Sequence, residues 1–170
     1  MEVNIRPEQL ADRAVIRQIN EEAFGRANEA DLVDALRGAE AVSASLVADV
    51  DGVVAGHILF SPVTVDGPTG RFPAVGLAPL AVRPAYQRRG LGGQLIRAGL
   101  EACRQAGHEL VFVLGHADYY PRFGFRPAQP LGLRWEVAVP VEVFLVAELR
   151  PGALAGRSGV LKYHPAFAGV

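Results

Sequence analysis

The sequence predicts a mixed α/β (α+β) fold, built as a single domain over residues 1–170. Its segments follow the order strand, two helices, three strands, helix, strand, helical turn and strand. This order favours a mixed sheet with flanking helices over an alternating, doubly wound one. Asp51-Gly52 stands between two apolar runs, and this pair is typical of a two-residue hairpin turn. No repeat and no linker long enough to separate two domains interrupts this order.

The N-terminal part of the chain predicts one strand followed by two helices. Val3–Arg6 has strand-like patterning, and Pro7 suits the first turn of a helix because an N–H has no partner there. A helix is predicted from Glu8 to about Ala23, closed by Gly25, and a second over Ala30–Arg37. The apolar residues that define the first helix are Leu10, Ala14, Val15, Ile19 and Phe24.

The rest of the chain predicts the sheet and a third helix. Strands are expected over Ser45–Val50, Val53–Val65, Val75–Val82, Leu110–Leu114 and Val141–Leu149. A loop from Asp66 to Pro73 separates the second of these strands from the third. A long amphipathic helix is expected over Leu91–Gln105 and a helical turn over Asp118–Arg122. The Gly- and Ala-rich tail from about Pro151 is left unassigned.

Composition and charge narrow the class of protein. Apolar residues make up 50% of the chain, which permits a sizeable core, and the formal net charge of −1 argues against nucleic-acid binding. Cys103 is the one cysteine, so no intramolecular disulfide is expected. There is no signal-peptide pattern and no run near the ~18 apolar residues of a membrane span. We therefore expect a cytoplasmic protein without membrane or nucleic-acid partners; a homodimer stays open.

The most informative segment joins the Val75–Val82 strand to the helix that starts at Leu91. It reads Gln87-Arg88-Arg89-Gly90-Leu91-Gly92-Gly93. The first turn of a helix leaves backbone N–H groups without internal partners, and their partial positive charge favours an anion. The glycines let a phosphate approach those amides, and the two arginines add positive charge.

Other phosphate-binding motifs fit this turn less well. A Walker loop requires Lys-Ser/Thr after its second glycine, whereas Gly93-Gln94 follows Gly92 here. The dinucleotide pattern G-x-G-x-x-G requires glycine at Leu95. The structural alternative is that the glycines only permit a tight turn before the helix.

Two segments of the chain resemble a known family. The motif Gln87-x-x-Gly90-x-Gly92 and the wider string Leu80–Leu95 are similar to the acetyl-CoA signature of the GNAT superfamily of N-acetyltransferases. The run His116–Phe125 resembles its second conserved region, and the likeness extends over about Val3–Leu149. This resemblance implies a GNAT-like mixed central sheet with a splayed, bulged central strand. It also implies acetyl-CoA as cosubstrate and an amine acceptor, either a small molecule or a protein.

Pro79 supports an opening in the central strand. Proline cannot donate to a strand ladder and is normally confined to edges or bulges, yet its apolar neighbours indicate a central strand. The conflict disappears if the sheet opens here, and the alternative is that Pro79 ends the strand. In the family, the pantetheine arm of the cofactor lies in this gap. The resemblance therefore implies that the cofactor contacts Leu80, Ala81, Val82, Gln87, Arg88, Arg89, Gly90, Leu91, Gly92 and Gly93.

Acyl transfer from a thioester to an amine requires an oxyanion donor and a proton for the departing thiolate. A backbone N–H of the bulged strand, at Leu80 or Ala81, is the candidate donor. Tyr120 lies four residues before Gly124-Phe125, which is where the family places its general-acid tyrosine. The alternative is that Tyr120 only packs, and we expect packing for Tyr119.

The chain departs from the family pattern in two places. No asparagine follows Asn28, so a frequent pantetheine ligand is absent, and Ala78-Pro79-Leu80 lacks the strand glutamate that often relays the amine proton. The general base is therefore open between a water chain, a neutral substrate and His116; His116 and Asp118 are expected mainly to fix their loop. His57 and His164 lack metal-like partners in the sequence, so no metal is predicted.

The remaining candidate residues each have a structural alternative. Cys103 is expected to be a buried thiol, because a reactive cysteine requires an exposed, electropositive site. Trp135 and Phe144 either line the acceptor site or belong to the core. A cationic acceptor or a solvated helix face would each account for the acidic residues Glu21, Glu22, Glu29, Asp31 and Asp34.

Three functions are compatible with these residues. The leading one is an N-acetyltransferase that transfers the acetyl group directly to a primary amine. The second is a non-catalytic module that binds acyl-CoA as a sensor, and the third is an acyltransferase that uses a longer acyl-CoA.

Overall fold

The computed structural model describes residues 1–170, which divide into two compact units. The first comprises Met1–Ser61, Ala78–Gly99 and Pro165–Val170, and the second Pro62–Leu77 and Leu100–His164. Strands β3 (Val53–Gly67) and β4 (Gly70–Val82) contribute residues to both units.

The first unit is built on strands in the order β1-β2-β3-β4. Strand β1 (Val3–Pro7) pairs antiparallel with β2 (Ala44–Val50), which pairs antiparallel with β3. The turn between β2 and β3 has φ of 50° at Asp51 and 86° at Gly52. Positive φ at both central residues is the backbone of a type I′ hairpin, so the predicted hairpin is confirmed.

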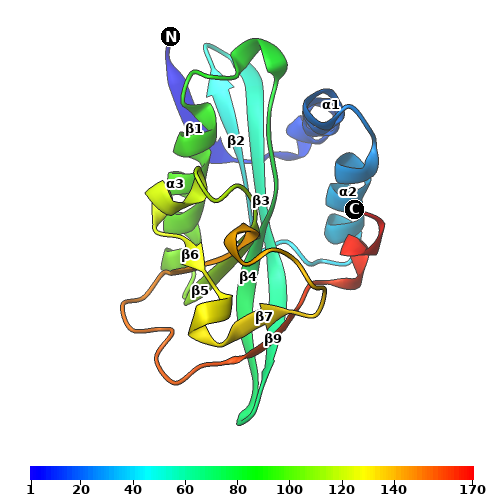
Figure 1. The fold of residues 1–170 in the computed structure, drawn as a ribbon. Helices are drawn as coiled ribbons and strands as arrows, with labels where there is room; N and C mark the ends of the chain where they lie inside the picture. The colour runs from blue at the N-terminus through cyan, green and yellow to red at the C-terminus, as the bar shows by residue number, and fades with distance from the viewer. The chain divides into compact units, whose positions relative to one another are not determined.

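Helices cover both faces of these strands. Helices α1 (Arg13–Phe24) and α2 (Asn28–Gly38) lie on one face, and α3 (Leu91–Gln105) begins on the other (Figure 1). Under α1 and α2 the buried cluster is Ile16, Leu32, Val33, Leu36, Ala41, Val47 and Leu59. Under the start of α3 it is Val50, Ala55 and Leu91, with Val3, Val82 and Tyr86 packed against it.

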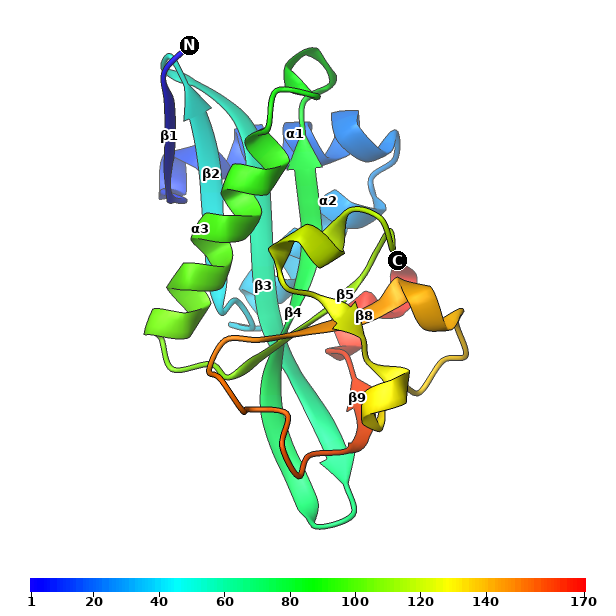
Figure 2. The same ribbon diagram turned by 60° about the vertical axis from the view of Figure 1, so that its left-hand side comes forward.

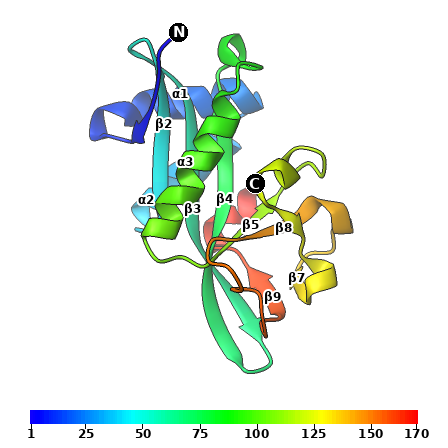
Figure 3. The same ribbon diagram turned by 90° about the vertical axis from the view of Figure 1, so that its left-hand side faces the viewer.

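Helix α3 lies against the strands (Figure 3). It approaches them closely because glycines stand where the helix and the strands meet. A Cβ at Gly56 of β3 would lie 3.0 Å from Leu95 Cδ1 of α3. A Cβ at Gly99 of α3 would collide with the ring of Phe60, which is fully buried. The separation between helix and sheet is therefore set by the lack of a side chain at these two positions.

Substituting Gly99 with alanine is expected to lower the free energy of unfolding by about 1–3 kcal/mol, because a close-packed core cannot yield to the extra methyl group without strain. Chemical denaturation measures this change. Gly38→Ala is the matched control, since Gly38 also lies in a helix and has no atom within 4 Å of an added Cβ. Equal stability of both variants would contradict the described packing.

The second unit contains strands in the order β3-β4-β5-β8-β6, of which β3, β4, β5 and β8 are labelled in Figure 2. Strand β5 (Leu110–Leu114) pairs parallel with β4 and antiparallel with β8 (Phe144–Glu148), which pairs antiparallel with β6 (Arg126–Pro127). Its core is formed by Val63, Val65, Ala74, Leu110, Phe112, Ala128, Leu133, Phe144, Val146, Ala153 and Leu161.

Strand β4 pairs with β5 over only part of its length. The parallel pairing joins Val75 to Val111 and Gly76 to Phe112, and it ends there. Pro79 follows within the same strand, which continues to Val82. The predicted opening of the central strand is thus confirmed, and Pro79 lies inside the strand rather than at its end.

Four predictions of local structure were wrong. Pro7 ends β1, so α1 starts only at Arg13 after a 3₁₀ turn over Leu10–Asp12. Leu10 is 77% exposed, because the buried face of α1 consists of Ile16, Ile19 and Asn20. The expected loop up to Pro73 is a tight turn, since β4 begins at Gly70. Val141–Val143 form a 3₁₀ turn before β8.

The unassigned tail is ordered. Strand β9 (Gly159–Lys162) pairs antiparallel with β3 and parallel with β7 (Leu133–Trp135). Within the first unit, the 3₁₀ segment Pro165–Gly169 packs on α2, where Asn28 Nδ2 donates to Gly169 O at 2.9 Å. None of the helices has the length and apolar character required to cross a membrane.

Candidate active site

The segment Gln87–Gly93, called the phosphate turn from here on, contains two residues with positive φ. Arg88 has φ of 62° and Gly90 has φ of 81°, both in the left-handed region. Gln87 Nε2 donates to Val82 O at 2.9 Å and so ties the turn to the end of β4. Helix α3 starts at Leu91, directly after Gly90. The chain thus reverses tightly from the strand into the helix.

The first amides of α3 have the properties of an anion site. The N–H of Gln94 donates to Gly90 O at 3.1 Å, so the N–H groups of Leu91, Gly92 and Gly93 precede the first internal bond of the helix. Arg88 and Arg89 are exposed beside them, and the Arg89 guanidinium lies 5.5 Å from the Tyr86 ring centroid. Amide dipoles and two guanidinium groups therefore favour a phosphate here.

Tyr120 lies in the second unit, at the start of a 3₁₀ turn over Tyr120–Phe123 that Gly124 closes with φ of 93°. Its ring packs edge-on against Phe125 at 5.6 Å and Tyr119 at 5.2 Å. A Cβ at Gly115 would collide with this ring. Gly115 therefore provides the space that Tyr120 occupies, a role that sequence spacing alone did not reveal.

The protonation state of Tyr120 follows from its burial. Desolvation, with a smaller contribution from Tyr119, raises the pKa of Tyr120 to about 12. A phenol with this pKa remains protonated at neutral pH, so it is available as a proton donor and not as a base.

Phe144 and Trp135 contact other aromatic rings, and His116 contacts its own loop through its backbone. The backbone carbonyl of His116 accepts the N–H groups of Tyr119 and Tyr120, at 3.2 and 3.3 Å, while the side chains of His116 and Asp118 are exposed. Phe144 is fully buried and stacks on Phe112, with ring centroids 5.6 Å apart. Trp135 packs edge-on against Tyr163 within the same unit.

Cys103 is buried on α3, and burial raises the pKa of its thiol to about 12. A thiol in this state is a poor nucleophile because the thiolate is the reactive form. No three His, Cys, Asp or Glu side chains are grouped as a metal-binding cluster.

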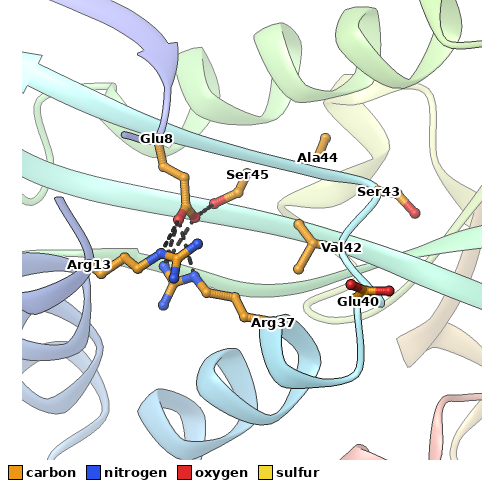
Figure 4. Close-up of a pocket in the computed structure, with 8 residues that line it drawn as sticks. All are labelled: Glu8, Arg13, Arg37, Glu40, Val42, Ser43, Ala44 and Ser45. Carbon is orange, nitrogen blue, oxygen red and sulfur yellow. Dashed lines mark hydrogen bonds and ion pairs between the residues drawn. The ribbon is translucent and has the colours of Figure 1, made fainter. Parts of the chain in front are cut away.

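A surface pocket of about 570 Å³ lies in the first unit, away from the phosphate turn in sequence (Figure 4). Its lining is Glu8, Arg13, Arg37, Glu40, Val42, Ser43, Ala44 and Ser45. The Glu8 carboxylate accepts two bonds from Arg37, at 3.0 and 3.1 Å, and one from the Ser45 hydroxyl. The carboxylate at the centre of this pocket thus has three hydrogen-bond donors and forms an ion pair with Arg37.

A buried hydrogen-bond chain leads inward from this pocket. Asn20 Nδ2 lies 3.3 Å from Nδ1 of His57 and also donates to Ile16 O, so Nδ1 of His57 is the acceptor. The other ring nitrogen, Nε2, then carries the proton and donates to Ser45 Oγ at 2.9 Å. His57 is fully buried, and desolvation lowers its pKa to about 3.

This pKa shift predicts a loss of stability in mild acid. Below pH 6.5 the His57 imidazole is protonated in the unfolded chain but remains neutral in the folded protein. The free energy of unfolding therefore falls by about 1.4 kcal/mol for each pH unit of acidification. Urea denaturation between pH 7.5 and pH 5 measures this slope, in a range where carboxyl groups remain charged. His57→Gln should flatten the slope, whereas the exposed control His116→Gln should keep it. An unchanged slope in His57→Gln would refute the assignment.

Comparison with known proteins decides the family. The family model described as "Acetyltransferase (GNAT) domain" matches residues 4–128. The chain is 37% identical over 164 residues to an uncharacterized N-acetyltransferase, YhbS, of Escherichia coli (strain K12), covering 96% of this chain and 97% of YhbS. The chain belongs to the GNAT family of N-acetyltransferases. It is an acyltransferase with the mixed open sheet and flanking helices of that fold.

Further relatives agree with this assignment. YjhQ of E. coli (strain K12), also an uncharacterized N-acetyltransferase, is 48% identical over 119 residues, which are 69% of this chain and 66% of YjhQ. The crystal structure of E. coli YhbS in complex with CoA matches with a TM-score of 0.92 and 36% identity, covering 98% of this chain and 92% of YhbS. A GNAT acetyltransferase from Brucella melitensis in complex with acetyl-CoA has a TM-score of 0.81 and 38% identity, covering 98% of both chains.

Proposed function

We propose that the protein transfers the acetyl group of acetyl-CoA directly to a primary amine. The observation that carries this proposal is the phosphate turn. It follows the part of β4 that lies beyond the pairing with β5. It presents the first amides of α3, which lack partners within the helix, together with two exposed arginines. Similar proteins of known structure are complexes with CoA and with acetyl-CoA. The geometry of this chain and the ligands of its relatives therefore both support acetyl-CoA as the acetyl donor.

In this proposal the cofactor binds along β4 and the phosphate turn. Leu80, Ala81 and Val82 offer backbone groups of β4 beyond the last residue that pairs with β5. The pantetheine amides are then recognised as a neighbouring strand would be. The pyrophosphate binds the amides of Gly90–Gly93, Arg88 and Arg89 add charge, and Gln87 keeps the turn in place through its bond to Val82.

The chemistry requires one donor and one acid. The amine nitrogen attacks the thioester carbon, and we propose that the Leu80 N–H stabilises the resulting oxyanion. As the carbon–sulfur bond breaks, Tyr120 gives its proton to the thiolate and the amine loses its own proton to solvent. Burial raises the pKa of Tyr120 to about 12, so its hydroxyl carries a proton at neutral pH, and the same rise makes it a weaker acid.

Titration calorimetry and an amine screen test the proposal. We expect saturable binding of acetyl-CoA, followed by release of free CoA thiol when one of a panel of primary amines is added. Binding without thiol release from any amine would favour the sensor function, and faster release from longer acyl-CoA donors would change the proposed substrate. The absence of binding at millimolar acetyl-CoA would contradict the proposal itself.

A further inference from the structure

A pocket in the second unit lies between the turn that joins β3 to β4 and the segment that leads into β9. Strand β9 runs beside the end of β3 (Figure 2). The pocket has a volume of about 230 Å³, below the ~300–1,000 Å³ of sites for drug-sized ligands, so it suits a small ligand. Two arginines, two hydroxyl side chains and no carboxylate are found in its lining, which is Gly67, Pro68, Thr69, Gly70, Arg71, Phe72, Gly156, Arg157 and Ser158.

The two walls of this pocket are held together by close backbone packing. A Cβ at Gly67 would collide with Ser158 O, and a Cβ at Gly159 would collide with Asp66 O. Directly beside these contacts, Asp66 of β3 pairs with Val160 of β9. The walls therefore have a fixed separation, and the side chains that line the pocket start from a rigid backbone.

Arg157 offers unpaired donors to this pocket. Its side chain is only 29% exposed, and its Nη1 lies 3.2 Å from Oε2 of Glu109. The guanidinium carbon lies 5.1 Å from the centroid of the Phe72 ring, which supports the group from one side. Its Nε and Nη2 have no partner in the protein. Donors of a charged, half-buried group gain most from an acceptor that is itself charged.

Arg71 also retains donors. Its Nε donates to Asp66 Oδ1 at 2.7 Å, and both of its Nη nitrogens remain available. The side chain is 73% exposed, so it can adjust to a ligand. The hydroxyl groups of Thr69 and Ser158 complete the polar lining.

The cations around the pocket outnumber the carboxylates that pair with them. Each of two carboxylates is shared by two cations, so four positive groups are only half neutralised. A phosphate monoester carries a charge of about −1.5 to −2 at neutral pH, which is close to this excess. The shared ion pairs are those of Asp66 with Arg71 and Lys162, and those of Glu109 with Arg150 and Arg157.

We propose that this pocket is a binding site for a phosphate group, either inorganic phosphate or the phosphate of a small phosphomonoester. Arg157 binds its oxygens through Nε and Nη2, and Arg71 through its Nη nitrogens, in the forked geometry that suits phosphate. The Ser158 hydroxyl donates to a further oxygen. A single carboxylate would balance only half of the excess charge. All of these residues belong to the second unit, and the inference does not depend on the proposed acetyl transfer.

Calorimetric titration with phosphate tests the site. The protein is first saturated with CoA, so that the phosphate turn is occupied, and is then titrated with inorganic phosphate and with glycerol 3-phosphate in separate runs. Sodium chloride keeps the ionic strength constant. We expect saturable binding of at least one of the two, with Kd of about 1 mM or lower. Tighter binding of glycerol 3-phosphate identifies a phosphomonoester as the ligand, and tighter or equal binding of inorganic phosphate identifies the free anion. If neither bound saturably at millimolar concentration, the inference would be wrong.

Variants place the binding in this pocket. Arg157→Gln and Arg71→Gln should each weaken phosphate binding by ~10-fold or more, the effect of losing a charge-assisted hydrogen bond. Because Arg71 is exposed, its replacement tests the site even if Arg157→Gln is poorly folded. Arg126→Gln is the matched control, since Arg126 is an exposed arginine of the same unit that lies 4.0 Å from Glu148. Equal weakening by all three variants would show that only net charge matters and would overturn the inference.

The phosphate turn requires its own control. Arg89→Gln should leave the binding of inorganic phosphate and glycerol 3-phosphate unchanged in the CoA-saturated protein. Phosphate binding that depended on Arg89 and not on Arg71 or Arg157 would assign the ligand to the phosphate turn and contradict the site. If CoA itself failed to bind, the proposed function would fail, while the Arg71 and Arg157 variants would still test the pocket.

Discussion

Replacing Tyr120 with phenylalanine is expected to lower kcat by about 100–10,000-fold, the usual contribution of a positioned general acid. The substitution removes only the hydroxyl, so the edge-on packing against Phe125 and the fit against Gly115 are retained. Affinity for acetyl-CoA should change little. Steady-state kinetics with a responsive amine, together with calorimetry for the cofactor, separate the two quantities.

The neighbouring tyrosine supplies the control for this prediction. Tyr119→Phe removes a hydroxyl from the same turn, and its ring packs on Phe123 and lies under Arg122. We expect kcat of this variant to stay within a few-fold of the original. Equal turnover of Tyr120→Phe and the unmodified protein at all pH values would show that Tyr120 only packs.

Introducing a carboxylate at the phosphate turn, by Gly92→Asp, is expected to weaken acetyl-CoA binding by about 100–1,000-fold. Two unit charges ~4 Å apart near a protein surface interact by about 4 kcal/mol, and each 1.4 kcal/mol is a tenfold change in affinity. An acid in the first turn of a helix is favourable for the helix itself, so α3 should remain folded. Calorimetric titration measures the affinity, and circular dichroism checks the fold.

Gly92→Ala separates charge from size at this position. The added methyl group crowds the amides without repelling phosphate, so the loss of affinity should be clearly smaller than for Gly92→Asp. Raising the salt concentration should narrow the difference, because exposed charges are screened. If Gly92→Asp bound acetyl-CoA as tightly as the unmodified protein, the turn would not hold the pyrophosphate.

The elements with strong local signals were predictable from the sequence. Helix α3 and strand β5 have the predicted bounds, and the hairpin at Asp51-Gly52 has the predicted backbone. Their signals are a long 3.6-residue period, an uninterrupted apolar run and a turn pair that tolerates positive φ. The opening at Pro79 was predictable because proline conflicts with a central strand.

Elements that depend on distant partners were not predictable in this way. Strands β6, β7 and β9 are short and form by pairing with strands distant in the sequence. Strand β6 pairs with β8, and β9 pairs with both β3 and β7. Pro7 has a backbone acceptable both to a strand end and to a helix start, and its place in the ladder opposite Leu46 decides between them. Local propensity does not contain that information.

The candidate site shows the same division. The helix start that follows Gln87–Gly90 and the helical turn that carries Tyr120 were predictable, because their signals are contained in short segments. The sequence did not show which arginine pairs with each acidic residue of α1 and α2. Arg17 of α1 forms ion pairs with Asp31 and Asp34 of α2, whereas Glu22 faces Arg83. The fit of Tyr120 against Gly115 and the burial of His57 likewise depend on folding.

The central claim is direct transfer of an acetyl group from CoA to an amine. Mass spectrometry of a reaction that contains the protein, acetyl-CoA with an isotope-labelled acetyl group and a panel of amines tests it most directly. We predict the label on an amine, free CoA in equal amount, and no label on the protein, because Cys103 is buried and protonated. Label that stays on CoA despite tight binding, or that appears on Cys103, would contradict the claim.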